Sequence, residues 1–122
     1  GHAIECRINA EAPMENFRPS PGKVGHTHLP GGNGVRVDTF IYTGYEIPTD
    51  YDSMIMKIIV HSENREETLR KMAAALDETV ILGIETNLDF QYQILHDPVF
   101  AKGLADTSFI GKFLKKKRME EE

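Results

Sequence analysis

The residues near the start of the chain alternate like a strand with one polar face, and Arg7 lies in the middle of that face. Apolar and polar side chains alternate over residues 4–11, so a strand would place Glu5, Arg7, Asn9 and Glu11 together on its polar face. The guanidinium of Arg7 stays cationic at physiological pH and donates forked hydrogen bonds to carboxylate, phosphate or oxyanion oxygens. The pattern alone leaves two interpretations, an anion-binding arginine or a solvent-exposed charge, because charged side chains are mostly exposed.

Five blocks of sequence follow one another in a fixed order. They are GHAIECRINAE at 1–11, FRPSPGK at 17–23, GGNGVR at 31–36, YDSMIMK at 51–57 and GIETN at 83–87. In residue identity and order these blocks closely resemble the C-terminal domain of biotin carboxylase, and the resemblance extends over residues 1–114. The alternative, an unrelated β-rich ligand-binding protein, requires five ordered matches to be accidental. The resemblance implies the last third of such an enzyme, with an ATP-grasp portion upstream.

The resemblance gives Arg7 a specific role. In this family ATP joins bicarbonate to phosphate, and the resulting carboxyphosphate supplies carbon dioxide and a phosphate that takes the proton from the ureido nitrogen of biotin. The ureido oxygen then becomes negative, and by resemblance Arg7 is the catalytic, biotin-contacting arginine. Glu11 is expected either to orient Arg7 or to face solvent. Asp52 is expected to pair with an arginine, to contact the ATP-grasp portion or to form a turn.

The resemblance also implies a homodimer. Arg36 matches an arginine at the family's subunit interface, and Asn33 matches a nearby position that can hold a large aromatic residue. Aromatic anchors dominate interface energies, so asparagine at this position should weaken the dimer. A mainly structural module for dimerisation and scaffolding is the alternative to an enzyme domain.

The implied cofactors and partners belong to the whole enzyme. ATP, Mg²⁺ or Mn²⁺, biotin and bicarbonate are expected there and none in these residues alone, so the isolated chain should be inactive. The expected partners are the ATP-grasp portion, the biotin carboxyl carrier protein and carboxyltransferase subunits. Ser53, which is often proline in long multidomain carboxylases, favours the biotin carboxylase subunit of acetyl-CoA carboxylase in fatty acid synthesis. Pyruvate and propionyl-CoA carboxylases are the alternatives.

Composition excludes several other classes of function. The chain has 122 residues and a formal net charge of -5, which fits one domain and argues against a nucleic-acid partner. No apolar run approaches the roughly 20 residues that cross a bilayer, and no signal-peptide pattern opens the chain. We therefore expect no membrane partner and a cytoplasmic protein of bacterial type, with an organelle stroma or matrix as the alternative. Residues 115–122 form a charged tail that we expect to be disordered.

Other chemistry-bearing residues have structural interpretations. Cys6 is the single cysteine and lies on the apolar face of the first strand, which favours a structural thiol. Lys57 should share a strand face with Ile55 and Ile59 and pair with a carboxylate. His26 and His28, with His2 as a third ligand, lack a cysteine or carboxylate at metal spacing, so we expect surface histidines and no metal.

These side chains need a scaffold, for which the sequence predicts an α+β fold. The expected N-terminal half is antiparallel and β-rich, of a rudimentary barrel-sandwich hybrid type, and packs with C-terminal helices. The glycines of residues 31–34 lack the lysine of a phosphate loop and predict a hairpin. The expected elements are strands at 2–9, 23–29, 35–41 and 54–61, a helix capped by Asn64 and Glu67 and ended by Gly83, a helix from 86–87 to before Asp97, and a short helix after Asp106.

Overall fold

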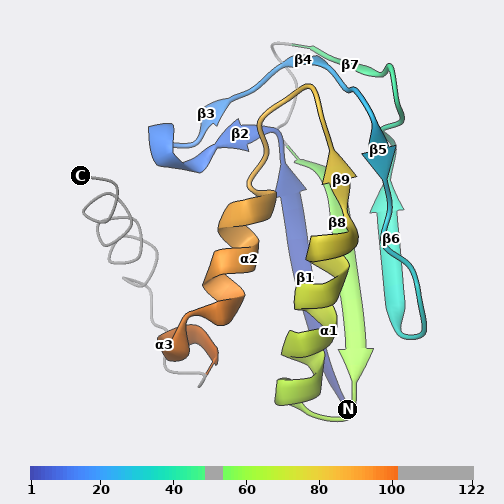
Figure 1. Cartoon of the computed structure of the whole chain (residues 1–122), viewed down its shortest axis with the longest axis vertical. Helices are drawn as coiled ribbons and strands as arrows, with labels where there is room; N and C mark the ends of the chain where they lie inside the picture. The colour runs from blue at the N-terminus through green and yellow to red at the C-terminus, as the bar shows by residue number, and fades with distance from the viewer. Residues whose placement is uncertain (49–53, 102–122) are drawn as a thin grey trace.

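The computed structural model describes residues 1–48 and 54–101. Helices α1 and α2 lie against one face of the sheet that contains β1 and β8 (Figure 1). The elements in chain order are β1 (His2–Asn9), β2 (Glu11–Ala12), the 3₁₀ turn η1 (Pro13–Glu15), β3 (Arg18–Pro19), β4 (Gly22–Lys23), β5 (Thr27–His28), β6 (Val35–Thr39), β7 (Glu46–Ile47), β8 (Met54–Ser62), α1 (Arg65–Glu78), β9 (Val80–Ile81), α2 (Leu88–His96) and α3 (Pro98–Ala101).

The central sheet has three antiparallel strands in the order β1–β8–β6. The most apolar strand, β8, occupies the middle, where a strand is covered on both edges, and the two alternating strands flank it. Three two-stranded antiparallel pairs complete the β-rich half: β2 with β3, β4 with β7, and β5 with β9. The predicted α+β class, with an antiparallel N-terminal half packed by C-terminal helices, is confirmed.

The two faces of β1 differ as the alternation predicted. Cys6 and Ile8 are buried, whereas Glu5 and Arg7 are exposed. The buried face joins β8 and α1 in one hydrophobic core. Its largest fully buried side chains are Ile8, Val24, Ile55, Met56, Ile58, Val60, Thr68 and Met72. Arg7 therefore rests on a strand whose opposite face is packed, which limits the movement of its backbone.

Helix α1 begins as predicted and ends earlier. The Asn64 side chain accepts a hydrogen bond from the Glu67 backbone N–H at 2.8 Å, so Asn64 is confirmed as the cap. The Glu67 carboxylate, predicted as its capping partner, instead accepts from Ser62 Oγ at 3.0 Å. The prediction that Gly83 ends this helix is wrong. The helix stops at Glu78, and residues 80–81 form β9, paired with β5. Val80 falls at helical spacing, but a β-branched residue followed by Ile81 also suits a strand, and pairing with β5 decides between them.

The turn at residues 31–34 does not make a hairpin, and this prediction is also wrong. Strand β5 before the turn pairs with β9, while β6 after it pairs with β8, so the turn carries the chain from one sheet to another. Gly34 has φ +75, and a Cβ there would lie 2.7 Å from the His61 carbonyl oxygen. The glycine permits this close approach of the turn to β8.

Of the remaining predicted elements, one strand is divided in two, the end of one helix is confirmed, and others lie outside the described residues. The strand expected at 23–29 is two short strands, β4 and β5, because β4 pairs with β7 and β5 with β9. Helix α2 ends at His96, as expected before Asp97. Asp52, the short helix predicted after Asp106 and the tail at 115–122 lie outside the described residues.

Candidate functional site

The outer face of the central sheet carries a set of charged side chains, which we call the charged sheet face. Its strand registers align six residues in two rows that cross β1, β8 and β6. One row is Glu5–Ile59–Arg36, and the other is Arg7–Lys57–Asp38. Three of the five charged members are cations, so the face has an excess of positive charge although the whole chain is acidic.

Arg7 is held by a neighbour on its own strand. Its Nε donates to Glu5 Oε2 at 3.0 Å, and Lys57 Nζ lies 3.9 Å from Glu5 Oε1. The Glu5 carboxylate thus lies between two cations, one on each of its oxygens. The Arg7 side chain is 64% exposed, and in the part of the chain that the structure describes its guanidinium is engaged through Nε. Nη1 and Nη2 therefore remain to receive an anionic or developing oxyanion group.

The predicted orienting residues are placed differently from one another. The Glu11 carboxylate accepts a hydrogen bond from Asn9 Nδ2 at 3.1 Å, whereas Glu5 contacts the Arg7 guanidinium. Strand alternation predicted the same face for Glu5 and Glu11, and the side-chain geometry assigns the contact to Glu5. The role predicted for Lys57 is present as its pairing with Glu5.

The face of β8 breaks its alternation at one point. Ile55, expected beside Lys57 and Ile59, is 1% exposed, like its neighbour Met56. The register with β1 passes from Ile8–Met56 directly to Asn9–Met54, so Ile55 is an extra residue in β8. Such an irregularity turns the following side chains relative to the sheet, which places Ile55 in the core.

The two residues predicted at a subunit interface are exposed. Arg36 is 73% exposed, and its Nε donates to Asp38 Oδ1 at 3.1 Å. Asn33 is exposed in the turn before β6. Arg36 lies on the same face as Arg7 but two strands away, which corresponds to roughly 10 Å between the strand axes.

The backbone of Arg7 has a partner that the sequence analysis missed. Asn87 Nδ2 donates to the Arg7 carbonyl oxygen at 3.0 Å, and Gln91 Nε2 approaches the same oxygen at 3.4 Å. The signal in the sequence was the GIETN block, which served only to carry the resemblance. Nothing in its spacing indicates that Asn87 reaches a strand 80 residues away in the sequence.

Cys6 lies next to Arg7 and on the other face of the strand. Its residue is 4% exposed, and burial, with a smaller effect of the Glu5 charge, raises the pKa of its thiol to about 12. The thiolate is the reactive form of cysteine. The buried, protonated Cys6 therefore agrees with a structural thiol.

The histidines do not gather in one place. His2 pairs with Ser62 in the central sheet, whereas His28 lies on β5 and its Nδ1 is 3.1 Å from the Glu78 carbonyl oxygen. Within residues 1–48 and 54–101, no group of three or more His, Cys, Asp or Glu side chains is placed to hold a metal ion.

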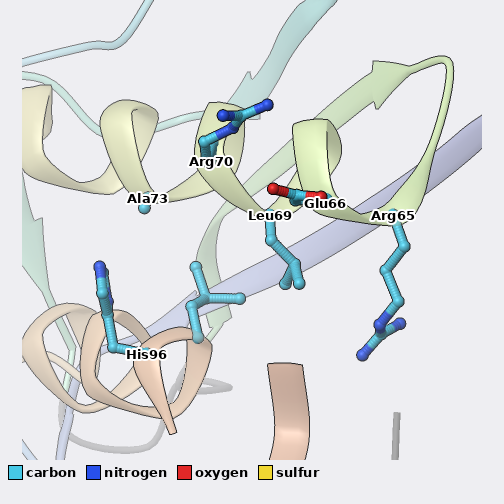
Figure 2. A pocket seen from close by; sticks show the side chains of 7 residues that line it. Arg65, Glu66, Leu69, Arg70, Ala73 and His96 are labelled. Carbon is cyan, nitrogen blue, oxygen red and sulfur yellow. The ribbon is translucent and has the colours of Figure 1, made fainter. Parts of the chain in front are cut away.

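A pocket of about 510 Å³ lies between α1 and α2 (Figure 2). Leu69 of α1 and His96 of α2 point into the space between the helices. Its lining residues are Arg65, Glu66, Leu69, Arg70, Ala73, Leu95 and His96. None of them is a predicted site residue, so this hollow and the predicted chemistry are on opposite sides of the sheet.

Among the described helices, none is long and apolar enough to span a membrane.

The fold and the charged sheet face define an α+β domain that presents an arginine on an antiparallel sheet packed by helices. The model of the biotin carboxylase C-terminal domain family matches residues 5–112, and the chain belongs to this family. The resemblance seen in the sequence is therefore confirmed.

Known relatives extend well beyond this chain. It is 54% identical to the biotin carboxylase of Allochromatium vinosum over 114 residues, which are 93% of this chain and 25% of the relative. It is 48% identical to a pyruvate carboxylase component from Methanothermobacter thermautotrophicus, covering 93% of this chain and 23% of that protein. The chain thus spans about a quarter of the curated relatives it matches, less than the third expected.

A similar solved structure is the biotin carboxylase domain dimer of Hydrogenobacter thermophilus 2-oxoglutarate carboxylase, in complex with MgADP, ADP and bicarbonate. It superimposes with a TM-score of 0.88 at 38% identity, over 90% of this chain and 24% of that one. The fold described above is therefore shared with about a quarter of that biotin carboxylase domain.

Proposed function

We propose that the chain is the C-terminal domain of an enzyme that carboxylates biotin on its carrier protein with ATP and bicarbonate, through carboxyphosphate. Family membership supports the reaction class. The observation that carries the proposal at residue level is Arg7: an exposed guanidinium on a strand with a packed back, oriented through Nε by Glu5. Its two terminal nitrogens are the groups that would meet the substrate.

Arg7 would act on the charge that develops during proton transfer. When the ureido nitrogen of biotin loses its proton to phosphate, the electron pair delocalises onto the ureido oxygen, and the nitrogen then attacks carbon dioxide. A guanidinium held in place before the reaction stabilises that oxygen without having to reorganise. Glu5 offsets part of the positive charge of Arg7 and Lys57 and fixes the direction of the Arg7 fork.

The other reactants are assigned to the rest of the enzyme. In this proposal ATP, its Mg²⁺ or Mn²⁺ and bicarbonate bind to an ATP-grasp portion upstream, and the H. thermophilus domain, with MgADP and bicarbonate, supports that assignment. The charged sheet face supplies cations for an anionic group. The isolated 122 residues are accordingly expected to be inactive.

We assign the enzyme to the biotin carboxylase subunit of acetyl-CoA carboxylase, in the cytoplasm or an equivalent organelle compartment. Its partners would be the biotin carboxyl carrier protein and carboxyltransferase subunits. The similarity to the A. vinosum biotin carboxylase and the serine at position 53 support this assignment. The similarity to a pyruvate carboxylase component keeps that enzyme, and a propionyl-CoA carboxylase, as alternative acceptor systems.

A second function, homodimerisation, is favoured by β6. Arg36 is the most exposed of the paired charges on the charged sheet face and lies near the exposed Asn33. The related H. thermophilus domain is a dimer. We propose that this edge of the sheet contributes to the subunit interface.

The test of the principal proposal is Arg7→Ala in a full-length carboxylase that carries this domain, for example with the remaining three quarters taken from the A. vinosum enzyme. Loss of one preorganised donor predicts a fall of about 100- to 1000-fold in biotin-dependent ATP hydrolysis. The melting temperature should not change, because Arg7 is exposed and its ion pair lies at the surface.

Arg18→Ala is the matched control. Arg18 is also exposed and paired with a carboxylate, Glu15, at 2.6 Å, but it lies on β3 outside the charged sheet face. It should retain full turnover. Unchanged turnover in Arg7→Ala would refute the catalytic role and leave the domain a scaffold and dimerisation module.

A further inference from the structure

Asn87 is a buried asparagine at the start of α2 whose side chain does not cap that helix. It precedes the first residue of α2, the N-cap position, at which asparagine is strongly preferred because its side chain accepts a helix N–H. Here the side chain makes no such bond, and the Leu88 N–H instead lies 3.3 Å from Thr86 Oγ1. Asn87 is 4% exposed. Its identity therefore needs an explanation outside the helix.

That explanation lies on β1. Asn87 Nδ2 donates to the Arg7 carbonyl oxygen at 3.0 Å, and Asn87 Oδ1 accepts from the Asn9 N–H at 2.7 Å. The Asn87 backbone N–H adds a bond to the Asn9 carbonyl oxygen at 3.1 Å. A primary amide has both a donor and an acceptor, so one side chain satisfies two backbone groups of opposite type.

These bonds lie on the edge of β1 that faces away from β8. Strand β1 is an edge strand in the described sheet, and an edge strand presents unpaired N–H and C=O groups. Asn87 therefore occupies the place of a neighbouring strand for the two residues Arg7 and Asn9. On the other side, the register with β8 shifts between Ile8 and Asn9, so the regular ladder is interrupted at the same level.

We propose that Asn87 is a positioning residue for Arg7: its amide clamps the β1 backbone and thereby sets the direction in which the guanidinium leaves the strand. The proposal rests on the role proposed above for Arg7. Arg7 is then fixed at its carbonyl oxygen, by Asn87 at 3.0 Å with Gln91 more distant at 3.4 Å, and at Nε by Glu5. Because Asn87 is buried at the edge of β1 and bonds to the strand's backbone, it acts through Arg7 and not by direct contact with biotin.

The test is Asn87→Asp in the full-length carboxylase. Aspartate has the same shape and keeps an acceptor for the Asn9 N–H, but it replaces the donor to the Arg7 carbonyl with a carboxylate oxygen. We expect kcat/KM for free biotin to fall about 10- to 100-fold, by analogy with the loss when a group that orients a metal ligand is removed. The KM for ATP should stay unchanged.

Asn64→Asp is the matched control, with the same chemical change at a helix start remote from Arg7. Among the described residues, the Asn64 side chain bonds through its acceptor oxygen, towards the Glu67 N–H. Aspartate caps equally well, so biotin kinetics should not change. Should the aspartate variant of Asn87 be insoluble, Asn87→Ser gives the same test without introducing a buried charge. It cannot make both bonds, and it should show the same selective loss.

A double-mutant cycle separates positioning from a general structural effect. If Asn87 acts through Arg7, adding Asn87→Asp to Arg7→Ala should cause no further loss in kcat/KM for biotin. Two losses that multiply, or an Asn87 variant with unchanged biotin kinetics beside an impaired Arg7→Ala, would overturn the positioning role. Full activity of Arg7→Ala would instead overturn the proposed function itself.

Discussion

At the scale of single residues, the ion pair between Arg7 and Glu5 is important for geometry more than for stability. Both side chains are well exposed, at 64% and 38%, and exposed pairs of this kind contribute roughly 0–1 kcal/mol. A bond through Nε nevertheless fixes the plane of the guanidinium. It thereby determines where the two terminal nitrogens lie when a substrate arrives.

The thiol of Cys6 provides a test of how tightly the strand beneath Arg7 is packed. With the pKa of the thiol raised to about 12 by burial, the thiolate fraction at pH 8 is about a thousandfold below that of an ordinary cysteine with a pKa of about 8.5. Iodoacetamide labelling of Cys6 in the native protein, followed by mass spectrometry of its peptide, should be slower than in urea by a factor of this order.

The direction of the pH dependence is equally specific. Because a raised pKa keeps the thiol protonated, native labelling should continue to rise about tenfold per pH unit above pH 9, whereas labelling in urea should level off there. A native rate that levels off near pH 8.5 would show an accessible thiolate and contradict the packed strand.

At the scale of elements, Gly83, two residues after β9, lies where the second half of the chain crosses the first. Gly83 has φ +92, and a Cβ there would lie 2.5 Å from the Lys23 carbonyl oxygen and 2.8 Å from the Gly25 nitrogen. These contacts are with backbone, which cannot swing aside. The glycine thus permits a close crossing of two chain segments rather than a helix end.

Gly83→Ala should therefore destabilise the domain by more than about 2 kcal/mol, since backbone strain of about 1–3 kcal/mol adds to the steric clash. Denaturant unfolding of the protein, monitored by a probe in this domain, measures the change. Gly32→Ala is the comparison, because Gly32 has φ +122 but open space around it.

Gly31→Ala completes the series, since Gly31 has neither a positive φ nor a neighbour within 4 Å, and it should change stability by less than about 0.5 kcal/mol. The expected order of destabilisation is Gly83, then Gly32, then Gly31. Equal effects at Gly83 and Gly32 would show that the close crossing contributes nothing beyond strain.

At the scale of the whole molecule, the two faces of the central sheet differ in what covers them. Helices α1 and α2 cover the inner face (Figure 1). The charged sheet face carries the two rows of residues that the strand registers align. Arg7 on β1 and Arg36 on β6 are at its two sides, so a proposed substrate contact and a proposed subunit contact share one surface.

Arg36→Glu is predicted to weaken the homodimer by at least about tenfold in Kd, since a reversed charge would face the same partner group and lie beside Asp38. Sedimentation velocity of the full-length enzyme over a concentration series measures the change. The fold should be retained, because an exposed ion pair contributes little to stability.

Arg70→Glu is the control for charge reversal, because Arg70 is exposed on α1, on the side of the molecule opposite Arg36. It should leave the dimer unchanged. Equal weakening by both variants would indicate a general effect of net charge, and no weakening by Arg36→Glu would remove β6 from the proposed interface.

Sequence alone was sufficient where neighbouring residues contain the information. The two-residue alternation of β1 predicted which face carries Arg7, the Asn64 cap predicted the start of α1, and the apolar run of β8 predicted a central strand. The ordered blocks were sufficient for the family. Each of these features depends on local side-chain periodicity or on the identity and order of neighbouring residues.

Only the tertiary structure decided which distant groups meet. Val80 lies in a strand because β5 is beside it. The glycine turn connects two sheets because the strands on either side of it pair with different partners. The Asn87 side chain bonds to β1 and does not cap its own helix. The physical reason is the same in each case. A backbone or amide group bonds with whatever the packed core brings within about 3 Å, and this partner is set by the fold of the whole chain rather than by adjacent residues.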